Sequence, residues 1–222
     1  MQRPNNAAFG CRHELLSCPG VTKPHQAIKP DAVSTTLVIA DLACRRGGRL
    51  LFDGISARVP PGGALQLVGP NGAGKSSLLR LLAGLLPAAA GRVEFVGRRA
   101  FLGHEVALKP RQTLGSELAH WARLDGGADR LPAALGAMNL DALIDVPCRM
   151  LSSGQKRRAG LARVMAAGAD LWLLDEPTAG LDTASAALLA QAMAAHRAAG
   201  GIVVAAVHGD IGLDGADVVR LG

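Results

Sequence analysis

The stretch "VGPNGAGKSSLL", Val68–Leu79, decides the fold of this chain. It has the spacing G-x-x-x-x-G-K-[ST] and lies between an apolar run, "GALQLVG", and a leucine-rich run, "SLLRLLAGLL". We therefore expect a glycine-rich loop that joins a buried strand to a helix. In such a loop, backbone N–H groups and the positive end of the helix dipole point at phosphate oxygens. The stretch predicts a nucleoside triphosphate site, but it does not say what the nucleotide is used for.

Two side chains of this loop have the chemistry that a nucleotide needs. Lys75 would reach the β- and γ-phosphates, and the Ser76 hydroxyl would bind Mg²⁺. The strand and helix patterns on either side disfavour the alternative of a glycine-rich loop without a ligand. The residues predicted to bind the nucleotide are Gly69, Pro70, Asn71, Gly72, Ala73, Gly74, Lys75, Ser76 and Ser77.

Composition limits the class of protein. The 222 residues are 49% hydrophobic and contain no tyrosine, which favours one domain with an aliphatic core. The net charge of +6 permits contact with nucleic acid or an anionic membrane. However, the basic residues occur in the short clusters "RRGGR", "GRR" and "QKRR" with little aromatic interleaving, so we predict solvated faces and no nucleic-acid partner. No apolar run reaches about 18 residues, so we expect no membrane-spanning helix.

The chain changes character after its first 36 residues. Residues 1–36 contain several prolines and no sustained periodicity, so we expect a disordered extension or a start codon assigned too early. The part from 37 to 222 is regular, and its residues 113–145 have a helical pattern. Buried strands that alternate with helices predict an α/β fold with its ligand at the strand ends. The β-type runs are Leu37–Cys44, Gly63–Val68, Arg92–Phe95, Leu171–Leu174, Ile202–Val207 and Ala216–Leu221.

A second motif, "LWLLDEPTAGLD", ends an apolar run with two carboxylates. Asp175 at the strand end would lie beside Mg²⁺. Glu176 follows it directly and could polarise a water for in-line attack on the γ-phosphate. An acidic pair after an apolar run is also common in plain strand-end turns, but the phosphate loop upstream favours a functional pair.

A third motif, "LSSGQKRRAGLARVMAAGAD", opens with residues that suit a helix N-terminus. Hydroxyl groups and glycine N–H groups at a helix start form an anion site. One phosphate loop does not need a second anion site of its own. We therefore predict that two copies of the chain enclose two nucleotides, and that the serine-glycine turn of each copy faces the phosphate loop of the other.

These motifs, together with "GLD" and a histidine after a late strand in "VVAAVHGD", resemble the ATP-binding cassette ATPases from about Leu37 to the C-terminus. The resemblance implies a P-loop core of ABC type over residues 37–222, with a mixed sheet flanked by helices. It also implies an all-helical subdomain at about residues 106–160. It makes Glu176 the catalytic base and His208 the switch residue near the γ-phosphate. The remaining residues that it implies are Ser152 and Gly154 on the partner's nucleotide, Asp182 between the two sites, and Ser76 and Asp175 on Mg²⁺.

Within this superfamily, the stretch "FLGHEVALKPRQTLGSELAHWA" and the text around the phosphate loop are similar to the ATP-binding subunit of the bacterial haem exporter, the CcmA family. That resemblance implies ATP and Mg²⁺ as cofactors and integral membrane subunits as partners. It implies a peripheral protein on the cytoplasmic face of the bacterial inner membrane. Its ATP hydrolysis would drive haem export or haem-chaperone release in c-type cytochrome biogenesis. Two alternatives stay open: the subunit of another ABC exporter, and a regulatory ATP-binding module with weak hydrolysis.

Three positions depart from the family pattern. No tyrosine can stack on adenine, and the matching neighbourhood holds Arg45 and Arg46, followed by Phe52. The signature has Ser153 where many cassettes have glycine. Glu105 stands where the resemblance places a glutamine beside Mg²⁺, so we expect a second carboxylate at the metal, beside Asp175, and slow turnover.

Overall fold

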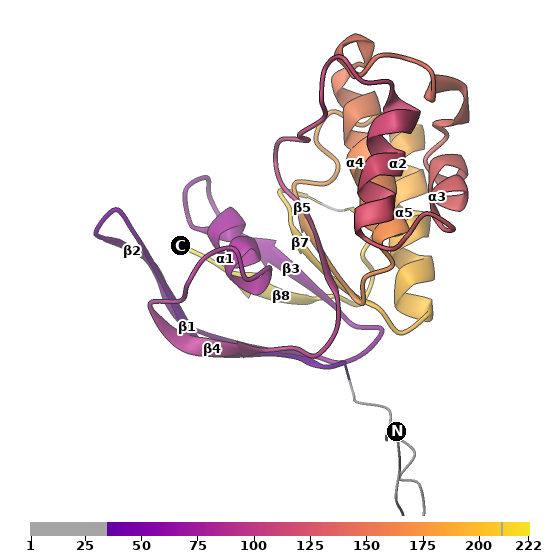
Figure 1. The fold of residues 1–222 in the computed structure, drawn as a ribbon. Coiled ribbons are helices and arrows are strands. Elements are labelled where there is room, and N and C mark those ends of the chain that lie inside the picture. Colours follow the sequence, from indigo (N-terminus) through magenta and orange to yellow (C-terminus); the bar gives the residue numbers. More distant parts are fainter. Residues whose placement is uncertain (1–34, 210) are drawn as a thin grey trace, which may run out of the picture. The chain divides into compact units, whose positions relative to one another are not determined.

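The computed structural model describes residues 35–209 and 211–222. The predicted extension therefore lies outside the described residues, apart from its last two. The described part contains two sheets, which Figure 1 shows with their helices. The first is antiparallel, in the order β2-β1-β4, and consists of β1 (Leu37–Arg46), β2 (Arg49–Val59) and β4 (Ala90–Glu94).

The second sheet is parallel and carries the motifs. Each neighbouring pair in its order, β5-β6-β7-β3-β8, runs in the same direction. All of its strands therefore end at one edge, where ligands of α/β proteins bind. Its strands are β3 (Ala64–Val68), β5 (Arg99–Leu102), β6 (Leu171–Asp175), β7 (Ile202–Ala206) and β8 (Asp217–Arg220).

The central strands of this sheet are buried on both faces. Leu171 and Leu173 of β6 belong to the core beneath the antiparallel sheet, whereas Trp172 and Leu174 belong to the core beneath the larger group of helices. The same alternation continues along β7. Successive side chains of a strand point to opposite faces, so a continuous apolar run fits a strand that is covered on both sides. This burial explains why the sequence pattern finds β6 and β7 readily.

Helices cover both faces of the parallel sheet. Leucines of α1 (Lys75–Leu82) join the core shared with the antiparallel sheet, and α1 contacts β6 and β7. On the other face α4 packs against β5 and α5 packs against β7, while α2 and α3 pack on α4 (Figure 1). These helices are α2 (Leu114–Leu124), α3 (Leu131–Ala137), α4 (Ser153–Ala167) and α5 (Thr183–Ala198), with 3₁₀ turns at Asp141–Leu143 and Cys148–Met150.

The structure confirms the predicted α/β class and refines its details. Each of the six predicted β-type runs overlaps a strand, although the parallel and antiparallel strands lie in separate sheets. The sequence pattern does not predict β2 or β5. β2 is largely exposed and includes Gly54 at φ 65, while β5 has four residues and begins with an arginine. Neither strand has the apolar alternation on which the prediction depends.

Helix α4 approaches β5 closely because residue 160 is glycine. A Cβ atom on Gly160 would lie 2.6 Å from Leu102 Cδ1 and 3.1 Å from Val106 Cγ1. In α3, a Cβ atom on Gly136 would have its nearest neighbour, Asp141 Oδ2, at 3.7 Å, which is an ordinary contact. The two helical glycines therefore differ in the space around them.

This difference predicts opposite effects of one substitution. We expect Gly160→Ala to lower the free energy of unfolding by about 1–3 kcal/mol, because the new methyl group overpacks the contact with β5. We expect Gly136→Ala to raise it by about 0.5–1 kcal/mol, because alanine is the better helix former. Urea unfolding of both variants measures the two changes. A Gly160→Ala protein as stable as the wild type would contradict the close packing of α4 on β5.

Candidate functional site

The phosphate loop joins β3 to α1 as predicted, and its glycines are needed for the backbone. Gly69, Gly72 and Gly74 all have positive φ, at 150°, 82° and 104°. A side chain on Gly74 would place its Cβ atom 2.9 Å from Phe52 Cδ1. Gly74 also precedes α1 without a capping side chain, so the first-turn N–H groups of α1 are left for a ligand. The loop therefore has the geometry of an anion site.

Lys75 is held inside this loop. Its ammonium donates to the carbonyl oxygen of Gly69 at 2.7 Å and to that of Pro70 at 3.1 Å. The residue is 6% exposed, so a buried positive charge lies at the phosphate position. Two hydrogen bonds use two of the three N–H donors of an ammonium and leave one for a phosphate oxygen.

Ser76 and Asp175 meet although they come from distant parts of the chain. The Ser76 hydroxyl donates to Asp175 Oδ1 at 3.0 Å. Asp175 is 1% exposed, and its second oxygen, Oδ2, is buried without a hydrogen-bond partner among the described residues. A buried carboxylate oxygen without a partner is costly and fits a cation. Hydroxyl and carboxylate oxygens are ligands that Mg²⁺ prefers, so these two residues fit the predicted metal site.

Glu176 lies directly after β6 in a strained conformation. Its φ of 49° is in the left-handed region that non-glycine residues rarely adopt, and its backbone N–H donates to Ala206 O at 3.0 Å. Two histidines flank its carboxylate. His208 Nε2 lies 3.2 Å from Oε1, and His104 Nδ1 lies 3.4 Å from Oε2. The structure therefore brings the predicted pair Glu176 and His208 together and adds a third residue.

Sequence reasoning missed His104. The residue follows β5 in the "LGH" turn, and the pattern does not identify β5 as a strand. A signal was nevertheless present, because a polar residue just after a strand of a parallel sheet lies at the ligand edge. Glu105, the next residue, is exposed, and its side chain forms no hydrogen bond or ion pair within the described part of the chain. Its place beside Mg²⁺ stays a prediction.

Arg157 corrects one prediction. The cluster "QKRR" was predicted to be a solvated face, but Arg157 is 3% exposed and lies on the inner side of α4. The prediction is wrong for this residue because its guanidinium finds carbonyl acceptors in the interior, among them Gly103 O at 2.8 Å and His104 O at 3.0 Å. Burial lowers the pKa of Arg157, and the nearby carboxylates of Asp175 and Glu176 oppose that change.

The signature motif begins α4 with a capping box. The Ser152 hydroxyl accepts from Gln155 N at 3.2 Å, and the Gln155 side chain accepts from Ser152 N at 2.8 Å. A Cβ atom on Gly154 would lie 2.6 Å from Gly180 O, so this helix start packs closely against the loop after β6. No hydrogen bond joins this turn to the phosphate loop within residues 35–209 and 211–222. The role of Ser152 and Gly154 in a second copy stays a prediction.

Asp182 begins α5. Its carboxylate accepts from Ser185 N at 2.7 Å, and this hydrogen bonding lowers the pKa of Asp182. The carboxylate thus remains ionised at the positive end of the α5 dipole, which stabilises the helix start. The geometry accounts for a helix cap, and the predicted part of Asp182 in linking two nucleotide sites stays a prediction.

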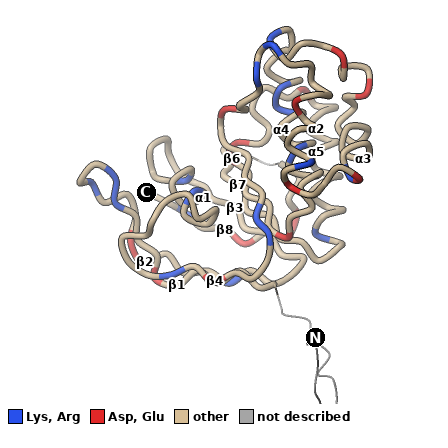
Figure 2. Tube along the Cα trace, in the orientation of Figure 1, with Lys and Arg blue, Asp and Glu red and all other residues tan. Residues whose placement is uncertain are grey.

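The neighbourhood predicted for the adenine base is basic. Phe52 is 7% exposed and packs against the phosphate loop, so its ring is not free to stack on a base. Arg45 and Arg46 are exposed at the end of β1, next to the turn into β2, where the trace in Figure 2 has the colour of Lys and Arg. A guanidinium plane can stack on an aromatic base, so these arginines can take the place of the missing aromatic.

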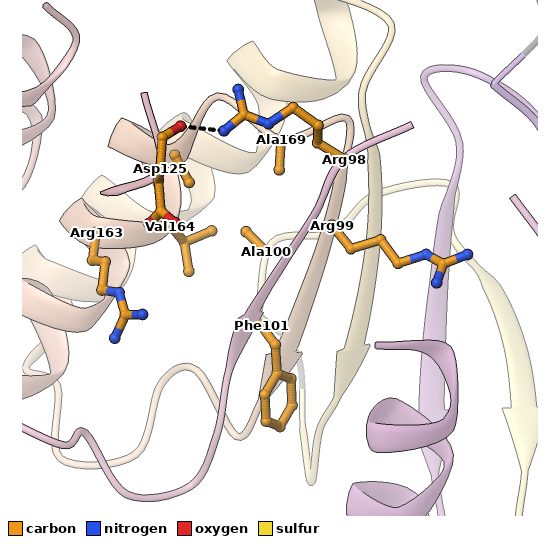
Figure 3. A pocket seen from close by; sticks show the side chains of 9 residues that line it. Arg98, Arg99, Ala100, Phe101, Asp125, Arg163, Val164 and Ala169 are labelled. Atoms are coloured by element: carbon orange, nitrogen blue, oxygen red, sulfur yellow. Dashed lines mark hydrogen bonds between the residues drawn. The ribbon is translucent and has the colours of Figure 1, made fainter. Parts of the chain in front are cut away.

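Two hollows of the surface differ in their position and in the side chains that line them. A hollow of about 470 Å³ lies beside the phosphate loop and has Gly69 and His208 in its wall. Another, of about 320 Å³, is lined by Arg98, Arg99 and Arg163. Its guanidinium groups point in different directions, and Arg98 donates to the Asp125 carbonyl (Figure 3). The second hollow therefore does not form a convergent anion site.

Among the helices of the described residues, none is long and apolar enough to span a membrane.

Comparisons with known proteins agree on one family. The family described as "ABC transporter" matches residues 52–179. The chain is 52% identical over 194 residues to the "Cytochrome c biogenesis ATP-binding export protein CcmA" of Rhodospirillum rubrum, which covers 82% of this chain and 83% of that protein. It is 48% identical over 194 residues to the protein of the same name from Gluconobacter oxydans, with coverage of 87% and 91%.

Solved structures show the same fold. The structure of an ATP-binding subunit of an ABC transporter matches with a TM-score of 0.75 and 22% identity, covering 84% of this chain and 86% of that one. An ATP-binding cassette of an ABC transporter in its ADP conformation matches with a TM-score of 0.68 and 22% identity, covering 83% and 86%. At this identity the likeness concerns the fold alone.

The geometry of the loop predicts the effect of removing its ammonium. We expect Lys75→Ala to weaken ATP binding by at least about tenfold, since one hydrogen bond to a charged group contributes about 1.5–3 kcal/mol. Titration with a fluorescent ATP analogue measures the change. Lys109→Ala removes the same charge from an exposed loop and should leave binding unchanged. If both variants bound the ATP analogue with the same affinity, Lys75 would not contribute to the nucleotide site.

Proposed function

The chain belongs to the CcmA family of ABC transporter ATPases, and we propose that it is the ATP-hydrolysing subunit of a haem exporter that acts in c-type cytochrome biogenesis. Its hydrolysis would drive haem export or the release of a haem chaperone. The observation that supports haem as the transported molecule is the 52% identity to a cytochrome c biogenesis export protein over most of both chains. The motifs by themselves support ATP hydrolysis and do not identify the transported molecule.

The proposed chemistry follows from the residues at the strand ends. Lys75 and the start of α1 neutralise the phosphate charge, and Ser76 and Asp175 would hold Mg²⁺, which stabilises charge on the transferred phosphoryl group when bound. Glu176 accepts a proton from the attacking water and so directs it at the γ-phosphate. His208, which lies against Glu176, is placed to contact the γ-phosphate from the end of β7. Phosphoryl transfer needs this positioning and neutralisation more than covalent catalysis.

We further propose that two copies form the complete site. Ser152 and Gly154 begin a 15-residue helix with exposed polar groups, and they make no hydrogen bond to the phosphate loop of their own chain within the described residues. A helix start of this kind binds anions. In a dimer, it can cover the nucleotide that the partner holds, and Asp182 would lie between the two sites.

Integral membrane subunits are the proposed further partners, which places the chain on the cytoplasmic face of the bacterial inner membrane. The relatives are named as export proteins, and this part of the proposal rests on those names. The helical part of the chain also exposes large apolar side chains at Leu124, Ile144 and Met150. Exposed apolar side chains of this size are available for contact with another protein.

Glu176→Gln tests the proposed hydrolysis and the dimer together. The amide keeps the size of the side chain but cannot accept a proton as a base. We expect ATP affinity to remain, turnover to stop and an ATP-bound dimer to accumulate, as measured by light scattering with and without ATP. The control Glu94→Gln changes an exposed carboxylate on β4 and should hydrolyse ATP like the wild type.

The same variants test the cargo in cells. In a Rhodospirillum rubrum strain without its own CcmA, the wild-type chain and Glu94→Gln should restore haem-stained c-type cytochromes, and Glu176→Gln should not. ATPase activity in vitro without restored cytochromes would support the subunit of another exporter. Turnover by Glu176→Gln at the wild-type rate would refute the proposed base.

Glu105 favours the second candidate function, a regulatory ATP-binding module with weak hydrolysis. If Glu105 reaches the metal, its carboxylate repels the γ-phosphate and donates no hydrogen bond to water. We then expect Glu105→Gln to raise turnover or to lower the Mg²⁺ requirement, measured as Mg²⁺-dependent ATPase activity of both forms. Equal or slower turnover across the Mg²⁺ range would mean that Glu105 does not replace the family's glutamine.

A further inference from the structure

Arg157 occupies the junction between α4 and the catalytic loops. Its guanidinium contacts five backbone carbonyls, which matches the five N–H donors of an arginine side chain. Two of these carbonyls belong to the turn after β5, one belongs to the last residue of β6, and two belong to the segment that follows it. The acceptors are Gly103 O at 2.8 Å, His104 O at 3.0 Å, Pro177 O at 3.4 Å, and the carbonyls of Asp175 and Glu176.

The choice of acceptors leaves the reactive groups free. Arg157 forms no ion pair with a carboxylate among the described residues, although Asp175 and Glu176 are near enough to oppose the lowering of its pKa by burial. An ion pair would occupy oxygens that the metal and the attacking water need. By binding the carbonyls, the guanidinium balances the charge of both carboxylates and holds their backbone, while the carboxylate oxygens stay available.

This backbone needs to be held. Glu176 has a φ of 49°, and such a conformation persists at a functional site when the surroundings fix it. Arg157 binds the Glu176 carbonyl on one side, while Ala206 O accepts the Glu176 N–H on the other. The same guanidinium binds the His104 carbonyl, and the His104 ring lies 3.4 Å from the Glu176 carboxylate.

We propose that Arg157 is a positioning residue for ATP hydrolysis, which fixes the carboxylate of Glu176 and the imidazole of His104 against each other from its place on α4. This inference rests on the proposed function, because it assigns how the base of that reaction is held. Arg157 lies on the helix that begins with the signature turn, so a shift of α4 moves the base directly. His104 limits the rotation of the carboxylate from the side opposite His208.

A matched control exists at the other end of α4. Arg130 also clamps backbone carbonyls, with Nε donating to Ala166 O at 3.0 Å and Nη2 donating to Gly126 O at 2.9 Å. It thus ties the end of α4 to the segment before α3, away from the phosphate loop. Arg130 and Arg157 share their chemistry and differ in what they hold.

The test compares Arg157→Lys with Arg130→Lys. Lysine offers donors from one point and cannot span five carbonyls. We expect Arg157→Lys to lower kcat per bound ATP on the order of tenfold to a hundredfold, since small misplacements of catalytic groups have effects of that size. Its affinity for ATP should stay unchanged, because the phosphate loop is untouched. Arg130→Lys should lower the melting temperature and keep the wild-type kcat per bound ATP.

The outcomes separate the two proposals. The proposed function would be refuted if the wild-type chain did not hydrolyse ATP, or if Lys75→Ala hydrolysed ATP as fast as the wild type. If the wild type does hydrolyse ATP in a Lys75-dependent way, an unchanged kcat in folded Arg157→Lys would overturn the positioning role. Arg157 would then only stabilise the fold. If Arg157→Lys does not fold, His104 provides the second test. His104→Ala should lower kcat, and His104→Asn, whose amide nitrogen lies near the place of Nδ1, should restore it. Wild-type kcat in His104→Ala would also overturn the inference.

Discussion

The hydrogen bond between the Ser76 hydroxyl and Asp175 joins the start of α1 to the end of β6, and the two residues are 99 positions apart in the chain. A parallel sheet makes this contact possible, because it ends β3 and β6 at one edge with only β7 between them. The helices, the apolar cores on both faces and the glycine turn before α1 all serve to keep these two strand ends in register. Without that register the hydroxyl and the buried carboxylate could not share a cation.

The part of the fold that sequence predicts is the part that is buried on both faces. β6 and β7 are apolar at every position except the last residue of β6, Asp175, so a pattern of hydrophobicity suffices to find them. β5 is a short edge strand that begins with Arg99, and its burial depends on contact with α4, which local sequence does not reveal. Missing β5 also hid His104, because a residue is recognised as lying at the ligand edge when its strand is known.

The candidate site divides in the same way. The place of residues 69–77 between β3 and the start of α1 could be predicted from spacing, because a loop of this kind needs glycine at fixed points. The surroundings of Glu176 could not be assigned, since its neighbours come from three separate segments. Arg157 shows the reason most clearly. It stands in a run of basic residues that looks solvated, and the side of α4 that faces the interior is set by tertiary packing.

The candidate site contains two buried cations near two carboxylates. Lys75 and Arg157 are buried cations, and Asp175 is a buried anion next to the partly exposed Glu176. Both cations are held by carbonyl oxygens, so neither is committed to a carboxylate. A triphosphate would bring negative charge, which Lys75 can meet with its remaining N–H donor, whereas all five donors of Arg157 are bound to carbonyls. One cation is therefore placed to follow the ligand, and the other to keep the catalytic backbone fixed while the ligand binds and leaves.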